Sequence, residues 1–95
     1  MQPGFEGFDW DVGNVAHILR HGVTPEEVEE VARRLSLITI PGKPVGGEER
    51  WQLFGRTSAE RFLVVVFTIR RRLFRTVTAY PMNATQRRIY GPQID

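Results

Sequence analysis

The sequence predicts an α+β fold: an antiparallel β-sheet of about four to five strands, two N-terminal helices packed on one face, and a short C-terminal helix. Apolar residues recur at helical spacing in residues 11–35, and at the period of two that strands show in residues 50–80. A capping signal after Pro81 indicates the last helix. At 95 residues, the chain has the size of one domain, so we expect residues 1–95 to form a single unit.

The two N-terminal helices are predicted from their ends and their apolar stripes. Asp11 is a good N-cap and Gly22 a good left-handed C-terminal residue, and we expect the stripe between them to face the core: Val12, Val15, Ala16 and Leu19. Thr24-Pro25-Glu26-Glu27 combines an N-cap, a proline at the first helical position and a glutamate three residues after the cap. The helix that follows carries a second stripe: Val28, Val31, Ala32 and Leu35.

Strand patterns surround these helices. The predicted strands are residues 5–10, 37–40, 50–57, 61–70 and 73–80. A glycine-rich loop, residues 41–49, precedes the third. Asn83 and Gln86 form a capping-box pattern for a short helix that ends near Tyr90, before Gly91-Pro92.

A two-residue turn at Arg71-Arg72 sets the expected register, with Val66 opposite Val77 and Val64 opposite Ala79. These four residues, with Trp51 and Leu53, are then expected under the helices, and Arg75 falls on the same side. The opposite face is expected to be open and to carry Arg50, Gln52, Phe54, Arg56, Leu63, Val65, Phe67, Thr76, Thr78 and Tyr80. Arginines, hydroxyls and aromatics on an open sheet are typical of a platform for single-stranded nucleic acid.

Composition limits the function classes. There is no cysteine, so neither disulfides nor thiolate metal sites are available. Residues 1–47 hold seven acids and four bases, whereas residues 48–95 hold four acids and nine bases, all arginine. A basic half whose positive charges are all arginine favours a nucleic-acid or acidic partner, although a GC-rich genome or a heat-adapted host also raises the arginine content. The longest apolar run, residues 62–67, is too short to span a bilayer and no signal pattern precedes it, so we expect a cytoplasmic protein without membrane contact.

Several short motifs together resemble the BrnT family. They are Phe8-Asp9-Trp10-Asp11, Asn14, Arg20-His21-Gly22-Val23, Glu26-Glu27, Glu48-Glu49-Arg50-Trp51, Gly55-Arg56-Thr57, residues 63–68 and Arg87-Arg88-Ile89-Tyr90, in the family's order and spacing. The resemblance implies a toxin of a type II toxin–antitoxin module with a RelE-like fold, which cleaves mRNA without a metal or cofactor and arrests growth. It also implies a ribbon-helix-helix antitoxin of the BrnA kind, whose complex with the toxin represses their operon.

The sequence departs from the family pattern at two positions. The family usually ends its last strand with Ser-Ala-Arg and carries a glutamate four residues before the tyrosine of the final helix. In this sequence, the corresponding positions are occupied by Thr78-Ala79-Tyr80 and Gln86. A catalytically degenerate module that binds RNA or protein is therefore an alternative function, and a ParE-like poison of a protein target is a third.

Cleavage through the 2′-hydroxyl needs a base, an acid and a stabiliser of the charged phosphorane. Histidine titrates closest to neutral pH, so His21 is a candidate base or acid, with helix capping as the structural alternative. We expect Arg56 to bind phosphate in the catalytic centre and Tyr80 to stack on a base or assist proton transfer. Further RNA or phosphate contacts are expected from Arg50, Arg75, Lys43 and Arg87.

The remaining expectations concern metals and assembly. His17 and His21 stand four residues apart, as metal ligands on a helix do, but no third ligand accompanies them, so we expect no metal site. The sequence leaves open whether RNA is cut on the ribosome, and whether the chain forms a homodimer or a hetero-tetramer with its antitoxin.

Overall fold

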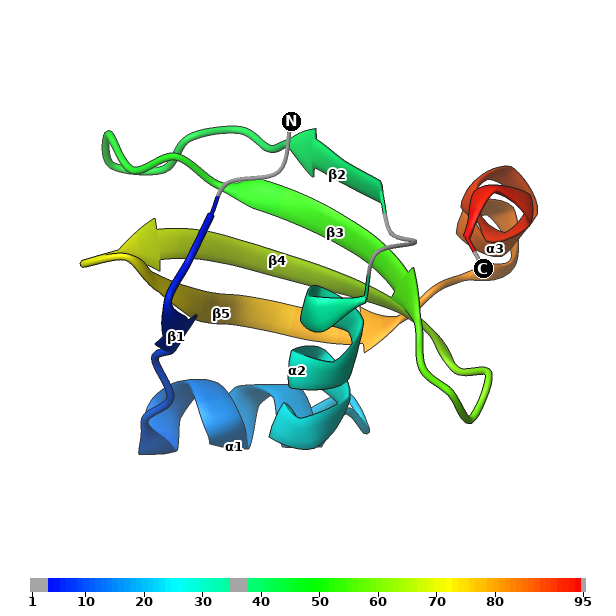
Figure 1. The fold of residues 1–95 in the computed structure, drawn as a ribbon, viewed down its shortest axis with the longest axis horizontal. Helices are drawn as coiled ribbons and strands as arrows, with labels where there is room; N and C mark the ends of the chain where they lie inside the picture. The colour runs from blue at the N-terminus through cyan, green and yellow to red at the C-terminus, as the bar shows by residue number, and fades with distance from the viewer. Residues whose placement is uncertain (1–3, 35–37, 95) are drawn as a thin grey trace.

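The computed structural model describes residues 4–34 and 38–94, and in this part of the chain five strands form one sheet (Figure 1). The strands are β1 (Gly7–Phe8), β2 (Ile38–Pro41), β3 (Trp51–Arg56), β4 (Phe62–Arg70) and β5 (Leu73–Pro81). Their order across the sheet is β1-β5-β4-β3-β2. Strands β2 to β5 are antiparallel, and only the short β1 runs parallel to its neighbour β5. The predicted α+β class is confirmed, with a mixed sheet.

Three helices accompany the sheet: α1 (Val12–Arg20), α2 (Pro25–Arg33) and α3 (Ala84–Tyr90), which a 3₁₀ turn, η1 (Gly91–Gln93), follows. Each α-helix begins with a complete capping box, formed by the pairs Asp11/Asn14, Thr24/Glu27 and Asn83/Gln86. Gly22 takes the left-handed conformation that the α1–α2 joint needs, with φ of +77°. The predicted helix starts are therefore confirmed. No helix in the described ranges is long and apolar enough to cross a membrane.

Helix α2 lies over one face of the sheet, which we call the helix face. Val28, Val31 and Ala32 are buried there, as predicted. Gly55 on β3 permits the close approach of α2, because a Cβ atom at Gly55 would lie 3.0 Å from the Cβ atom of Val31. Two residues that the sequence assigns to these elements, Leu35 and Leu37, fall outside the described residues.

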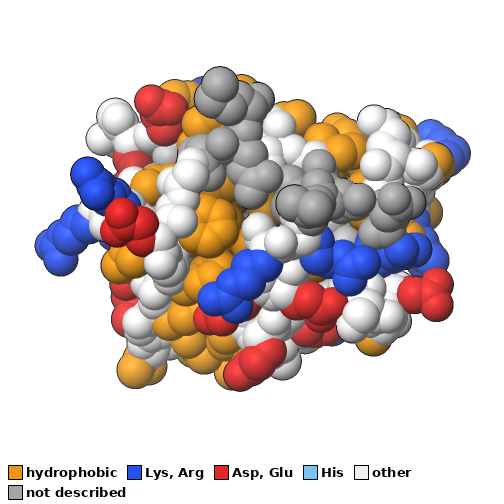
Figure 2. Space-filling view, viewed as in Figure 1, with side chains coloured by type: hydrophobic (Ala, Val, Ile, Leu, Met, Phe, Trp, Pro, Cys, Tyr) orange, Lys and Arg blue, Asp and Glu red, His pale blue; other side chains and the backbone are white. Residues whose placement is uncertain are grey.

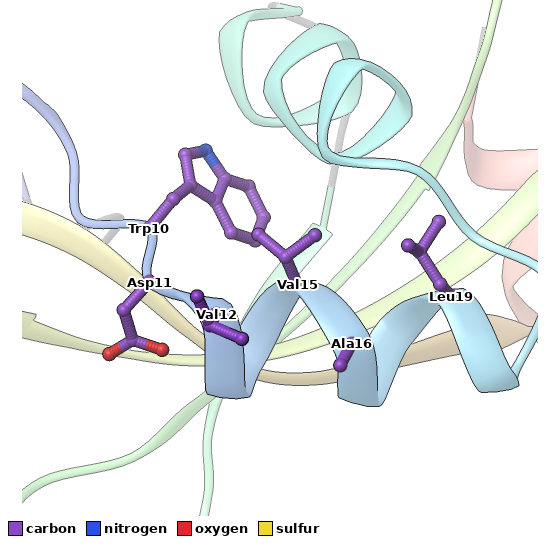
Figure 3. A pocket seen from close by; sticks show the side chains of 6 residues that line it. All are labelled: Trp10, Asp11, Val12, Val15, Ala16 and Leu19. Carbon is purple, nitrogen blue, oxygen red and sulfur yellow. The ribbon is translucent and has the colours of Figure 1, made fainter.

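Helix α1 runs along β5, and its predicted core stripe is wrong. Val12 is 86% exposed and Leu19 is 51% exposed, and both line a shallow apolar groove beside Trp10 (Figure 3). The buried residues of α1 are instead Asn14 and Ile18. The reason is that the Asn14 amide binds the backbone of β5, which turns the most apolar side of the helix away from the sheet.

A β-bulge at Val77 changes the predicted register. Arg70 pairs with Leu73 and Phe67 with Thr76, as expected, but Val66 pairs with Thr78 instead of Val77. Beyond the turn-proximal part of the hairpin, each β4 residue therefore meets a partner one position later than predicted.

The faces of β4 are consequently exchanged. Leu63, Val65 and Phe67 pack in the core of the helix face with Leu53, Ala79 and the partly buried Trp51, whereas Val64 packs on the other side. Thr76, predicted on the open face, is buried opposite Phe67, and Arg75, predicted under the helices, pairs with Thr68 on the second face. Because β4 is apolar on both sides, its sequence carried no alternation that could reveal the bulge.

Part of the second face is covered, contrary to the open platform predicted. A second cluster joins Phe54, Val64 and Ile94, with Tyr80, Met82 and Tyr90 packed against it. Tyr90 of α3 stacks on Phe54 with 3.9 Å between ring centroids, and this contact closes the helix against the sheet. The half of this face toward the β4–β5 turn is open in the described part of the chain.

The β4–β5 turn projects basic side chains from one end of the molecule (Figure 2). Both of its residues have positive φ, 52° at Arg71 and 67° at Arg72. This conformation costs a residue with a side chain about 1–2 kcal/mol relative to glycine, whereas Asn-Gly suits such a hairpin turn.

We therefore predict that Arg71-Arg72→Asn-Gly raises the free energy of unfolding by about 1 kcal/mol or more. The variant also removes the ion pair of Arg72 with Glu6, but both side chains are largely exposed and contribute little. Urea denaturation measures the change. The control Arg71-Arg72→Lys-Lys keeps charge and strain and should leave stability unchanged; an equal gain in both variants would contradict the explanation.

Candidate active site: an arginine groove on the second face

The open half of the second face forms a groove of about 480 Å³, where α1 meets β5. We call it the arginine groove. Its lining residues are Asp11, Gly13, Asn14, His17, Arg50, Thr68, Arg70, Arg75, Thr76 and Val77. It combines three arginines with one histidine, and the elements that meet there are the start of α1, the approach to β3 and the β4–β5 hairpin.

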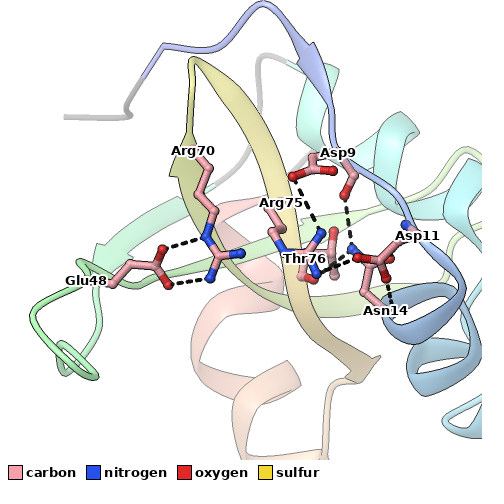
Figure 4. A network of polar contacts seen from close by, with 7 residues as sticks. All are labelled: Asp9, Asp11, Asn14, Glu48, Arg70, Arg75 and Thr76. Atoms are coloured by element: carbon pink, nitrogen blue, oxygen red, sulfur yellow. Dashed lines mark hydrogen bonds and ion pairs between the residues drawn. The ribbon is translucent and has the colours of Figure 1, made fainter.

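Arg75 is fixed by the segment that leads into α1. Its guanidinium lies 2.7 Å from the Asp11 carboxylate and 3.5 Å from that of Asp9 (Figure 4). Asp11 also accepts the backbone N–H of Asn14 as the N-cap of α1. The Asn14 N–H and the Arg75 guanidinium hold the pKa of Asp11 below its usual range. One carboxylate thus joins the helix cap to the groove arginine.

Glu48 fixes the other two arginines. Arg70 donates to both Glu48 oxygens, at 2.7 and 3.2 Å, and Arg50 lies 3.6 Å away (Figure 4 shows the Arg70 pair). Arg70 is the main reason that the pKa of Glu48 is lowered. The Nε atom of Arg50 is buried and has no hydrogen-bond partner in the described part of the chain. A ligand oxygen in the groove is the kind of acceptor that this donor lacks.

The charges of the groove balance. Three arginines, Arg50, Arg70 and Arg75, face three carboxylates, those of Asp9, Asp11 and Glu48. The ion pairs therefore orient the guanidinium groups but leave little net positive charge to attract a polyanion.

His17 lines the groove, although the sequence did not predict it as a residue of the site. Its Nε2 atom lies 3.0 Å from the hydroxyl of Thr78, and Arg20 lies 3.3 Å from its Nδ1 atom. Because arginine only donates, Nδ1 is the acceptor of that contact, which leaves Nε2 to donate to the Thr78 hydroxyl. The helical period of α1 places His17 on the side away from Val12 and Leu19. This spacing could have indicated that His17 faces the sheet.

His21 and Tyr80 continue from His17 toward α3. The rings of His17 and His21 are 5.1 Å apart, and those of His21 and Tyr80 are 6.5 Å apart. The backbone of His21 caps α1, as its structural alternative predicted, while its side chain is exposed. Both predicted residues therefore lie beside the groove, although neither lines it.

The remaining predicted residues lie elsewhere. Arg56, expected in the catalytic centre, pairs with Phe62 at the opposite end of β3 from the groove. Arg87 lies over the Phe62 ring, and Lys43 is exposed in the loop between β2 and β3. Only Arg50 and Arg75 are brought together in the groove.

Gln86, one of the two departures from the family pattern, has a structural task. Its side-chain oxygen accepts the N–H of Asn83 at 3.0 Å, and its own N–H donates to Asn83. A glutamate could accept the same hydrogen bond. Gln86 does not line the groove, so this departure leaves the groove unchanged.

The groove offers phosphate donors beside a proton-carrying imidazole. In residues 4–34 and 38–94, no three His, Cys, Asp or Glu side chains are grouped to hold a metal ion. The side chains present are of the types that cleave a phosphodiester by acid–base and electrostatic catalysis.

Comparison with known proteins agrees with this chemistry. The model of the family "Ribonuclease toxin, BrnT, of type II toxin-antitoxin system" matches residues 10–86, which is most of the chain. No curated protein sequence gives a significant match. The match spans α1, the whole β2–β5 sheet and the groove residues from Asp11 to Val77.

We predict that Asp11→Asn flattens the acid side of the stability profile. Because the folded pKa of Asp11 lies below its ordinary value of 3.8, its ionised form stabilises the fold above that value, and this contribution is lost as pH falls through the folded pKa. From about pH 5 downward the parent should therefore lose stability more steeply than the variant, as urea denaturation at stepped pH will show.

The matched control for this comparison is Glu26→Gln. Glu26 is exposed on α2 and makes no ion pair within the described ranges. Equal slopes for the parent and Asp11→Asn would contradict the role of Asp11 in the groove.

Proposed function

Because the chain belongs to the BrnT family of ribonuclease toxins of type II toxin–antitoxin systems, we propose that it is an endoribonuclease that cleaves mRNA and thereby stops translation and growth. The observation that carries the proposal is the arginine groove, where oriented guanidinium groups and His17 share one open concavity. Family membership makes the chain a toxin with an antitoxin partner; the substrate and the mechanism are our proposal.

The cleaved phosphodiester binds between Arg50 and Arg75. Both arginine side chains are only 21% exposed and are held by carboxylates, so little reorganisation is needed when negative charge develops on the phosphorane. Arg70, at the rim, contacts the adjacent phosphate.

The two histidines carry out the proton transfers. His17 acts in its imidazolium form: its Nε2 proton, which faces Thr78 in the free protein, passes to the leaving 5′-oxygen, and the ring becomes neutral with its remaining proton on Nδ1. The contact of Arg20 with Nδ1 is released when Nδ1 is protonated. His21, exposed and 5.1 Å away between ring centroids, accepts the proton of the 2′-hydroxyl. Tyr80 supports the His21 ring edge-on. The 2′-oxygen then bonds to phosphorus as the bond to the 5′-oxygen breaks, which gives a 2′,3′-cyclic phosphate and a 5′-hydroxyl.

A ribbon-helix-helix antitoxin neutralises the toxin. Exposed apolar patches on a small protein are typical of protein–protein contact sites, and α1 presents Val12 and Leu19 in a groove that Trp10 also lines (Figure 3). The same helix carries His17 and His21 on its other side. An antitoxin that binds α1 can therefore reach both the apolar stripe and the entrance of the groove.

We predict that induced expression of the chain arrests bacterial growth and that His17→Gln restores it. Loss of a general acid typically lowers the rate about 100-fold or more, whereas glutamine keeps a hydrogen-bond donor near Thr78. Growth curves and mapping of new RNA 5′ ends measure the effect. Arg88→Ala, an exposed change on α3, is the control and should remain toxic.

Three results would contradict the proposal. Normal growth with the folded parent protein present would favour a binding module that has lost catalysis. Equal toxicity of the parent and His17→Gln would remove His17 from the mechanism. Growth arrest without new RNA ends would favour poisoning of a protein target.

A further inference from the structure

We propose that Arg56, Phe62 and Arg87 form a second RNA-binding site, which holds a phosphate of the strand that flanks the cleaved bond. We call it the Phe62 site. The inference rests on the proposed function, because it takes the RNA strand as the ligand of the second face. Its starting point is the balanced charge of the arginine groove, which orients a phosphate but supplies little long-range attraction for a polyanion.

Two guanidinium groups converge on one aromatic ring at this site. The guanidinium carbon of Arg87 lies 4.4 Å from the centroid of Phe62, and that of Arg56 lies 5.9 Å from it. Contact with an aromatic face fixes a guanidinium plane and leaves its N–H edge available for a ligand. The two donors are thus oriented before any phosphate arrives, which lowers the entropy lost on binding.

The arginine charges at the Phe62 site are unbalanced, whereas those of the groove are balanced by carboxylates. Neither Arg56 nor Arg87 makes an ion pair within residues 4–34 and 38–94, whereas all three groove arginines do. In addition, the Nε atom of Arg56 is buried without a hydrogen-bond partner there. Two like charges near one ring repel, and an anion that contacts both relieves that repulsion.

The site lies on the sheet face that carries the groove. Arg56 pairs with Phe62, and the neighbouring pair Phe54–Val64 belongs to the cluster under α3, so Arg56 points to the same side. Arg50 and Arg56 are six residues apart along β3, or about 20 Å at about 3.3 Å per residue. A strand bound in the groove must therefore continue past α3 to reach Arg87, and one nucleotide cannot occupy both places.

A cavity of about 230 Å³ adjoins the site and is lined by Glu60, Arg61, Phe62, Pro81, Met82 and Arg87. Arg61 is neutralised by Glu27 at 2.6 Å. Glu60 is the acid that opposes an anion here, so its removal should strengthen RNA binding. An increase in RNA affinity when the Glu60 charge is removed distinguishes phosphate binding from simple packing of the arginines on Phe62, because Glu60 has no part in that packing.

The test measures the binding of a single-stranded oligonucleotide that carries 2′-O-methyl groups throughout and cannot be cleaved through its 2′-oxygen. Fluorescence anisotropy at several NaCl concentrations gives the Kd and its salt dependence for Arg87→Ala, Arg56→Lys and Glu60→Gln. The control is Arg88→Ala, which removes the same charge from the next residue of α3. Arg87 is exposed, so its replacement leaves the core intact.

We expect Arg87→Ala to weaken binding about three- to tenfold and to reduce the slope of log K against log salt by about 0.7. Arg88→Ala should change Kd less than about twofold. Arg56→Lys should keep the slope because the charge remains, and Glu60→Gln should tighten binding. A di- or trinucleotide, too short to extend from the groove past α3, should not distinguish Arg87→Ala from the parent.

Equal Kd and slope for Arg87→Ala and Arg88→Ala would overturn the Phe62 site and leave the proposed ribonuclease function standing if cleavage persists. A parent protein that binds no RNA would overturn both. Weaker binding of the antitoxin by Arg87→Ala, with RNA binding unchanged, would assign the site to the protein partner and overturn the present inference.

Discussion

Asn14 joins α1 to the bulge of β5, and the arrangement of the groove depends on this contact. Its amide donates to the carbonyl oxygens of Asp9 and Thr76, at 3.0 and 3.2 Å, while its oxygen accepts the N–H of Asp11 (Figure 4). The hydrogen bond to Thr76 is buried, so replacing Asn14 would leave that carbonyl oxygen without a partner and without access to water. Thr76 directly precedes the bulged Val77, and α1 is therefore attached at the point where β5 changes face.

The bulge has a chemical consequence. In a regular strand Arg75 and Thr78 would point to opposite sides of the sheet, because they are three positions apart. The extra residue at Val77 places both on the second face, Arg75 opposite Thr68 and Thr78 opposite Val66. Arg75 can then line the groove while Thr78 receives His17. Sheet geometry and helix position thus assemble the site together, and the charge pairs fix its guanidinium groups.

The sequence predicted local structure well and the register poorly. Helix starts at Asp11, Thr24 and Asn83 were predictable because a capping box needs only residues three apart. The bulge was not, since β4 is apolar on both faces and no alternation marks which side is buried.

The candidate site was likewise predictable in some residues and not in those whose positions depend on tertiary packing. His21 and Tyr80 were found beside the groove because the family resemblance singles out the His-Gly joint and the end of the last strand. His17 and Arg70 were missed as groove residues, because their positions depend on how α1 meets the hairpin. Arg56 was wrongly predicted to lie on the open part of the second face, because α3 covers the end of the sheet where Arg56 lies. The pairing of Arg70 with Glu48, 22 residues away in the chain, likewise depends on tertiary structure.

The most direct test of this account is the chemistry of the cut ends. The purified protein is incubated in EDTA with a DNA strand that contains one ribonucleotide, and the products are identified by mass spectrometry. Attack by the 2′-oxygen should give a single cut after the ribonucleotide, with a 2′,3′-cyclic phosphate on one product and a 5′-hydroxyl on the other. A 3′-hydroxyl product, or cleavage at deoxynucleotides, would contradict attack by the 2′-oxygen in the arginine groove.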